Sequence, residues 1–213
     1  MITGKRGEED MGETGVKDDA RGAAARLGMW LFIATEAFFF VAPLLLYAAY
    51  RYRYAPDFRA AGGELNLFIG AANTAVLLTS SLTMALAVNA GQRGDKRLTA
   101  VFLAATIILG SVLHVNKYAE WTAKISHGIY PNSEMLLTRP RGEVVFWGLY
   151  FFITGLHGLH VFIGVCLLTV MFFMRLANAP GGRYSAGLEN CGLYWHAVDV
   201  IWIYLFPFFY LIG

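Results

Sequence analysis

Five long apolar blocks, separated by polar connections, dominate the 213-residue chain. They cover approximately residues 26–50, 65–90, 98–121, 144–176 and 192–212. Each is long enough to cross a bilayer, since an α-helix needs about 20 residues to do so. None alternates between apolar and polar positions every second residue, as a strand of a membrane barrel does. Because a helix satisfies its own backbone hydrogen bonds in lipid, the pattern predicts an all-α polytopic membrane protein, a bundle of five transmembrane helices.

The first 25 residues differ from the rest, because they are polar, rich in both charge signs and interrupted by glycine. This composition predicts a disordered cytoplasmic tail over residues 1–25, followed by a five-helix transmembrane domain over residues 26–213. Five crossings place the two termini on opposite sides of the membrane. A small excess of basic residues, including Arg93, Lys96 and Arg97 between the second and third blocks, favours the N-inside, C-outside orientation.

The hydrophobic share, the net charge and the cysteine spacing argue against several classes of protein. The chain is 57% hydrophobic, which exceeds the usual share in a soluble domain. Its formal net charge is only +2, so we expect no nucleic-acid partner. The two cysteines, Cys166 and Cys191, lie far apart and do not form a zinc or redox motif.

Several polar side chains lie inside the apolar blocks, where ionisable groups are costly and usually functional. Their depths follow from a rise of about 1.5 Å per residue, counted from basic residues at the inner surface. The count predicts two layers. The inner half holds Glu36, Thr83, His196 and Asp199, and the middle of the membrane holds His114, His157 and His160.

Glu36 has two interpretations, a structural carboxyl between helices or a proton-linked group. We expect it to be protonated or to have a histidine or hydroxyl partner, because two neighbouring buried carboxylates do not both ionise readily. His157 and His160 are three residues apart and share one helix face. Helix–helix hydrogen bonding is favoured for them over ligation of a metal or haem. A haem b held by His114 and His157 at matched depth stays open.

Other polar pairs predict local interactions. His196 and Asp199 have the spacing of a pair within one helix, as do Lys117 and Glu120. For the second pair we expect an interfacial ion pair of little energetic value. Hydroxyl groups on the second block are more typical of contacts between helices than of a pathway. Three glycines are expected to allow close helix approach: Gly155, Gly158 and Gly164.

Four segments, taken together and in order, resemble a known family. They are residues 28–40 (GMWLFIATEAFFF), 73–81 (NTAVLLTSS), 154–161 (TGLHGLHV, followed by Gly164) and 192–202 (GLYWHAVDVIW). In these segments the chain resembles subunit III of the haem–copper oxidases, the cytochrome c oxidase subunit 3 family, in its five-helix bacterial form. Larger members of the family have seven helices and hold lipids in a cleft between the first two helices and the rest. The five predicted helices lack the counterparts of those two, so a neighbouring subunit would have to complete such a cleft here.

The resemblance implies an accessory subunit without a catalytic redox centre, cofactor or metal of its own. Subunit I of the complex would carry the haem and copper, and subunits I and II would be the protein partners. The complex reduces O₂ to water and pumps protons in aerobic electron transport, and subunit III stabilises subunit I, protects it during turnover and supports proton uptake. Glu36 corresponds to the family's membrane-embedded glutamate, which carbodiimide modifies. The expected location is the bacterial inner membrane, with lipid, including a bound phospholipid, as a further partner.

Other functions stay open at this point. The electron donor of the complex could be cytochrome c or quinol, and a related protein accompanies nitric oxide reductases. Two alternatives follow from the polar residues alone. A haem b membrane cytochrome would use the mid-membrane histidines, and a small proton-coupled transporter would use Glu36 and Asp199. The second is disfavoured because the chain shows no broken helix.

Overall fold

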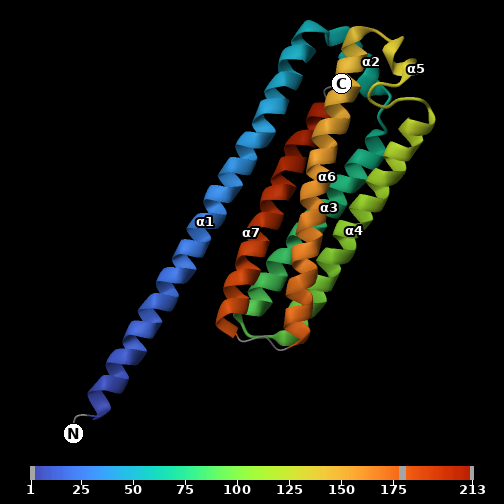
Figure 1. The fold of residues 1–213 in the computed structure, drawn as a ribbon. Coiled ribbons are helices and arrows are strands. Elements are labelled where there is room, and N and C mark those ends of the chain that lie inside the picture. The colour runs from blue at the N-terminus through green and yellow to red at the C-terminus, as the bar shows by residue number, and fades with distance from the viewer. Residues whose placement is uncertain (1–2, 178–180, 212–213) are drawn as a thin grey trace.

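The computed structural model describes residues 3–177 and 181–211, with side chains for 23–177 and 184–211. Every regular element in these ranges is helical (Figure 1). In chain order they are α1 (Thr3–Arg53), α2 (Ala55–Gly63), α3 (Leu67–Gln92), α4 (Lys96–Ser126), α5 (Glu134–Leu137), α6 (Arg141–Leu176), α7 (Gly181–Phe206) and the π-helical segment η1 (Pro207–Leu211).

Five of these helices are long and apolar enough to cross a membrane, as the hydrophobic pattern predicts. Successive spans run in opposite directions, so the beginning of α1 and the end of η1 lie at opposite ends of the bundle (Figure 1). The five apolar segments are Ala23–Arg53, Leu67–Gln92, Lys96–Ser126, Arg141–Leu176 and Tyr184–Leu211. Which end faces the cytoplasm stays a prediction.

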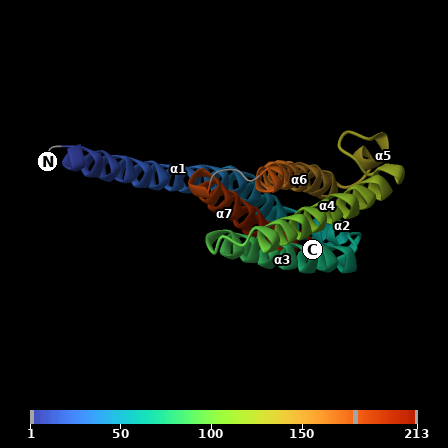
Figure 2. The ribbon, with the colours of Figure 1, turned by 90° about the horizontal axis from the view of Figure 1, so that it is seen from below.

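The helices pack as a bundle of four with α1 leaning on one side. α3 lies along α4 and α7, and α6 packs on α4, α7 and α2. α1 lies against α2, α6 and α7, and its N-terminal part extends past the bundle (Figure 2). The ribbon of α1 therefore diverges from the other helices with distance from α2 (Figure 1).

Two apolar cores hold the bundle together, one at each end. Near α2 the core is largely aromatic, and Tyr47 of α1 packs edge-on against Phe58 and Phe209 at 5.2 and 4.9 Å between ring centres. The Tyr47 hydroxyl also donates a hydrogen bond of 2.6 Å to the Phe208 carbonyl. Toward the α3–α4 turn the core is more aliphatic and centres on the buried Trp195. Aromatic packing thus joins α1 to the bundle near α2, and a further contact between the rings of Phe32 and Tyr194, 6.1 Å apart, joins it to the second core.

Small residues allow the indole of Trp195 to lie between α4 and α6. A Cβ added to Gly110 or Gly164 would approach the Trp195 ring to 2.7 or 2.8 Å, closer than real Cβ atoms come. A Cβ on Gly155 would lie 3.0 Å from Trp121. The prediction for Gly158 was wrong, because a Cβ there would meet no atom within 4 Å. Close approach therefore explains two of the three glycines singled out on the fourth apolar block.

Polar connections are more structured than the sequence suggests. The connection at residues 51–64 contains α2, and α7 begins at Gly181 although the fifth apolar block begins near residue 192. Side chains of Asn66 and Asp95 accept hydrogen bonds from the first free amides of α3 and α4, which caps those helices. α1 begins at Thr3, so helical backbone extends over most of the expected disordered tail; the division at residue 25 stays a prediction.

Arg139 joins the connections at the α2 end of the bundle. Its guanidinium donates hydrogen bonds to the carboxylates of Glu64 and Glu143. The hydrogen bond to Glu64 is the main cause that raises the pKa of Arg139 above its usual value. The arginine therefore keeps its charge, and it fastens the start of α6 to the segment that links α2 and α3.

Candidate functional site

Glu36 of α1 and His160 of α6 form the central contact of the candidate site. The carboxylate oxygen Oε2 lies 2.9 Å from Nε2 of the histidine ring. His160 is 9% exposed, and the Glu36 side chain is 26% exposed. The edge of Phe40 packs on the imidazole at 5.2 Å, and the Tyr194 hydroxyl donates to the His160 carbonyl at 2.9 Å. Glu36 thus has the histidine partner that the sequence predicts.

The two ring contacts of His160 limit where a proton can lie in this pair. Nδ1 of His160 lies 2.8 Å from the Leu156 carbonyl, which can only accept, so Nδ1 carries a hydrogen. In a neutral ring Nε2 is then an acceptor, and the proton in the contact with Glu36 belongs to the carboxyl. If the ring carries the proton instead, the pair is an imidazolium and a carboxylate. Either arrangement places one transferable proton between α1 and α6.

A groove of about 330 Å³ opens beside this pair, between α1 and α7. Glu36, His160 and His196 are its ionisable lining groups, and most of the remaining lining is aromatic or aliphatic. Trp30 and Phe32 of α1 and Tyr194 and Ile201 of α7 line its two sides. The groove is therefore an apolar space with a proton-bearing pair at its wall.

His196 and Asp199 of α7 form the local pair that their spacing predicts, at a long distance, and the histidine has a closer partner on another helix. Nδ1 of His196 lies 2.7 Å from the Ser81 hydroxyl of α3, and 3.9 Å from the nearer Asp199 oxygen. Asp199 is 2% exposed, and neither of its carboxyl oxygens has a hydrogen-bonding partner among the described residues. The histidine therefore links α7 to α3, while Asp199 is not among the residues that line the groove beside Glu36.

The remaining predicted interior groups connect helices. Thr83 of α3 and Thr106 of α4 join their hydroxyls at 2.8 Å. His114 of α4 has its ring nitrogens 3.1 Å from the carbonyls of Gly110 and Gly158, so a carbonyl acceptor is present for whichever nitrogen carries the hydrogen. His157 is buried, and its ring lies 5.1 Å from that of Trp202. Hydroxyls and histidines thus act as contacts between helices, and both ring nitrogens of His114 lie against backbone carbonyls.

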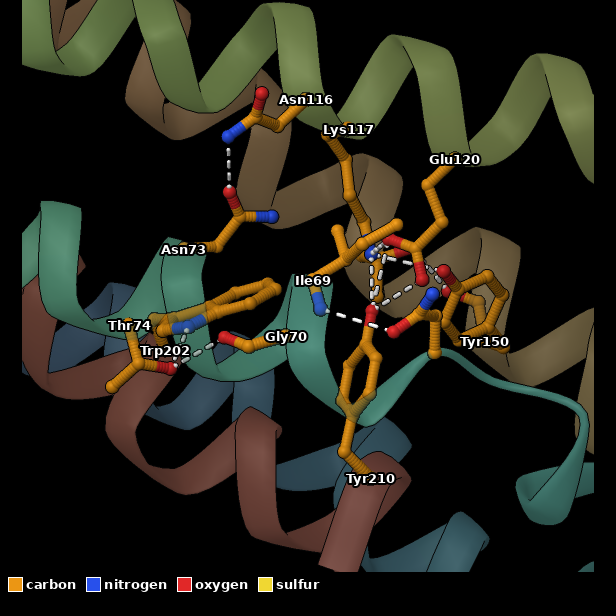
Figure 3. Close-up of polar contacts among 12 residues, drawn as sticks. Ile69, Gly70, Asn73, Thr74, Asn116, Lys117, Glu120, Tyr150, Trp202 and Tyr210 are labelled. Atoms are coloured by element: carbon orange, nitrogen blue, oxygen red, sulfur yellow. Dashed lines mark hydrogen bonds and ion pairs between the residues drawn. The ribbon is translucent and has the colours of Figure 1, made fainter.

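A buried ionic cluster on α4, α6 and η1 is the part that sequence reasoning missed (Figure 3). Lys117 donates to Glu120 at 2.9 Å, to the Tyr150 hydroxyl at 2.9 Å and to the Tyr210 hydroxyl at 3.0 Å. The Tyr210 hydroxyl donates in turn to Glu120 at 2.7 Å. The predicted pair of Lys117 and Glu120 is confirmed, but Glu120 is only 5% exposed, so the pair is buried rather than solvated and the expectation of little energetic value does not fit it. The i, i+3 spacing was visible, but the two tyrosines come from other helices.

Nearby, amide and indole groups extend the polar contacts between helices. Asn116 of α4 donates through Nδ2 to the Asn73 amide oxygen of α3 at 2.9 Å, as Figure 3 shows. The Trp202 indole donates to Thr74 at 3.0 Å. Among the described residues, no three His, Cys, Asp or Glu side chains come together as a metal-holding group. Hydrogen bonds of this kind join the helices inside the bundle. The pair of Glu36 and His160 lies at the groove beside α1.

Comparison with known proteins decides the family. The family model for cytochrome c oxidase subunit III matches residues 13–213. The chain belongs to this family. The subunit 3 proteins of Lemur catta, Homo sapiens and Bos taurus are 34%, 32% and 33% identical to it over 199 residues. These alignments cover 88% of the chain but 66% of the lemur protein and 69% of the human and bovine proteins, so the chain spans about two thirds of its relatives' length.

Family membership and the five apolar helices agree on a multi-pass membrane protein. The segments that carried the resemblance all lie in the bundle. Residues 154–161 include His157 and His160 on α6, and residues 192–202 place Trp195 in the core between α4 and α6. The recognisable motifs thus contribute largely to packing, and Glu36 lies on α1 within the first of them.

Proposed function

We propose that the chain is a non-redox accessory subunit of a respiratory terminal oxidase of the cytochrome c type. In this proposal it binds beside catalytic subunit I, which carries the haem and copper, and subunit II completes the complex. It stabilises subunit I and supports proton uptake while the complex reduces O₂ to water and pumps protons. The observation that carries the proposal is the match of the family model over residues 13–213.

Cytochrome c as electron donor is supported by the relatives, each of which is named a cytochrome c oxidase subunit. The chain spans about two thirds of the length of these relatives. The partners of the chain and the reaction of its complex are therefore part of the proposal. The proposed location is the bacterial inner membrane with the N-terminus inside, which the basic residues between the second and third spans favour.

Glu36 is the proposed functional carboxyl of the subunit. It shares a proton with His160, lines the groove between α1 and α7, and remains 26% exposed. A group at such a place can exchange a proton with its surroundings, whereas a sealed carboxyl cannot. The other interior polar groups have a supporting role in this proposal. Four of them contact neighbouring helices, namely Thr83, His114, His157 and His196. Asp199 is buried, with 2% of its surface exposed.

A phospholipid is the proposed occupant of this groove. Its lining combines aromatic and aliphatic side chains with the Glu36–His160 pair, which suits an acyl chain. The groove lies between α1 and α7, whose ribbons diverge toward the N-terminus of α1 (Figure 1). No redox cofactor is assigned to the chain in this proposal.

Labelling with a hydrophobic carbodiimide tests the role of Glu36. Activation of a carbodiimide consumes the proton of a carboxylic acid, so the proton-sharing carboxyl in an apolar groove should react first. Mass spectrometry of peptides from the intact labelled complex should locate the adduct on Glu36. Asp199 is the internal control, because it is a membrane carboxyl of the same chain but only 2% exposed. Labelling of Asp199 without Glu36 would contradict the assignment.

Removal of the whole subunit tests the accessory role. The oxidase purified without this chain should retain its haem spectrum and begin turnover normally, because the redox centres lie in another subunit. Its O₂ consumption should then decline faster during continuous turnover than that of the complete complex. Loss of the haem spectrum with removal of the chain would contradict the proposal.

A further inference from the structure

A small cavity lies at the centre of the bundle, apart from the α1 groove. Its volume is about 40 Å³, and helices α3, α4, α6 and α7 all contribute to its wall. Apolar side chains such as Leu77, Leu113 and Val161 form part of the wall. The rest is polar, with Asn73, Lys117, Thr154 and His157 among the lining groups.

His157 has a polar atom that no described residue satisfies. The residue is 4% exposed, and its Nδ1 is buried without a hydrogen-bonding partner. A buried ring nitrogen left without a partner costs about 1–3 kcal/mol, so native proteins seldom retain one without a water or ligand. The imidazole of His157 also lines the cavity, so the cavity adjoins the ring that carries this nitrogen.

Two other lining groups retain hydrogen-bonding capacity. The Thr154 hydroxyl donates to the Tyr150 carbonyl at 2.6 Å, which leaves its oxygen able to accept. The Asn73 amide oxygen accepts from Asn116, which leaves the amide NH₂ of Asn73 as a donor. Together with His157, they offer three polar partners to a molecule in the cavity, the number that a buried water usually finds.

The volume of the cavity also fits water. One water needs about 10–15 Å³ of such space, so 40 Å³ accommodates about three or four at most. An acyl chain or a haem needs far more room. We propose that this cavity binds ordered water, with one molecule hydrogen-bonded to Nδ1 of His157 and to the polar groups of Asn73 and Thr154.

The water site would also extend the ionic cluster into the middle of the bundle. Lys117 lines the cavity and at the same time binds Glu120, Tyr150 and Tyr210. Water beside His157 therefore joins a polar path that continues through Lys117 to η1. This path runs through α3, α4, α6 and η1, and it does not include the Glu36–His160 pair of the α1 groove.

Single-particle electron microscopy of the intact complex in lipid nanodiscs tests the site. The map must resolve ordered water elsewhere between the helices of this chain. The expected result is one to three separate peaks in the cavity, one of them about 2.7–3.2 Å from Nδ1 of His157. An empty cavity in such a map overturns the proposal, and so does continuous density of an alkyl chain.

A pair of variants separates the ring nitrogen from general packing. His157→Phe keeps a flat ring but has no nitrogen, so the peak next to residue 157 should disappear. Thr169→Val is the matched control on the same helix, because its hydroxyl donates to the Val165 carbonyl and does not line the cavity. All peaks should persist in it. A peak at residue 157 that persists in His157→Phe would overturn the assignment; if that variant does not assemble, the map of the native complex still decides.

Discussion

Replacement of Glu120 by leucine should be among the most destabilising single changes in the bundle. The variant leaves the Lys117 ammonium without its counter-charge and the Tyr210 hydroxyl without its acceptor. The side chains of Lys117 and Glu120 are 15% and 4% exposed, so solvent screens their interaction little. Removal of one partner of a buried pair typically costs about 3–5 kcal/mol, and we expect a loss of that size.

The double variant Lys117→Met/Glu120→Leu isolates the cause of the loss. It removes both charges together, and replacement of a whole buried pair by apolar residues is often close to neutral. The double variant should therefore be more stable than Glu120→Leu alone. Glu134→Gln, an exposed carboxylate at the start of α5, is the control and should change stability by less than about 0.5 kcal/mol.

Unfolding of the purified chain in mixed micelles, followed by circular dichroism as denaturing detergent is added, measures these differences. Non-additivity of the two single variants gives the coupling between Lys117 and Glu120. A loss below about 1 kcal/mol for Glu120→Leu would mean that the pair is solvated, as an exposed pair at the interface would be. Strict additivity would also refute the reasoning, because it would show that the charges do not depend on each other.

The remaining predictions concern packing and the α1 contact. Gly164→Ala should lower the free energy of unfolding by about 1–3 kcal/mol, because the new Cβ would lie 2.8 Å from the Trp195 ring. Gly158→Ala should leave that free energy unchanged or raise it by up to about 1 kcal/mol, because its Cβ would meet nothing within 4 Å. Detergent unfolding of both variants measures this contrast, and equal losses would contradict it. His160→Phe should remove the 2.9 Å contact with Glu36 and cost about 0.6–1.7 kcal/mol. Distances between spin labels on α1 and α7 should broaden in that variant and stay unchanged if α1 is held by other contacts.

The five spans could be predicted from hydropathy because each helix must bury about 20 apolar residues in lipid. Helix ends could not, because polar residues extend helices beyond the membrane. The segment before residue 192 is an example, since α7 already begins at Gly181. α2 also escaped prediction, because its 9 residues are too few for an apolar period.

Which side chains become hydrogen-bonding partners inside the bundle depends on how each helix is rotated about its own axis. The spacing of residues along one helix does not determine that rotation. Depth counting placed Glu36 in the layer of Asp199, yet its partner is His160 from the other layer. Tilt of α1 accounts for such an error of a few ångströms. Lys117 and Glu120 show the same limit, because their burial depends on Tyr150 and Tyr210 from distant parts of the chain.

Purification of the chain from its native membrane in mild detergent tests the central claim most directly. An accessory subunit of a terminal oxidase should co-purify at a fixed ratio with a larger subunit that contains haem and copper, and the complex should reduce O₂ with cytochrome c as donor. The separated chain should then have no Soret band. Purification of the chain alone, or a haem bound to this chain, would contradict the account.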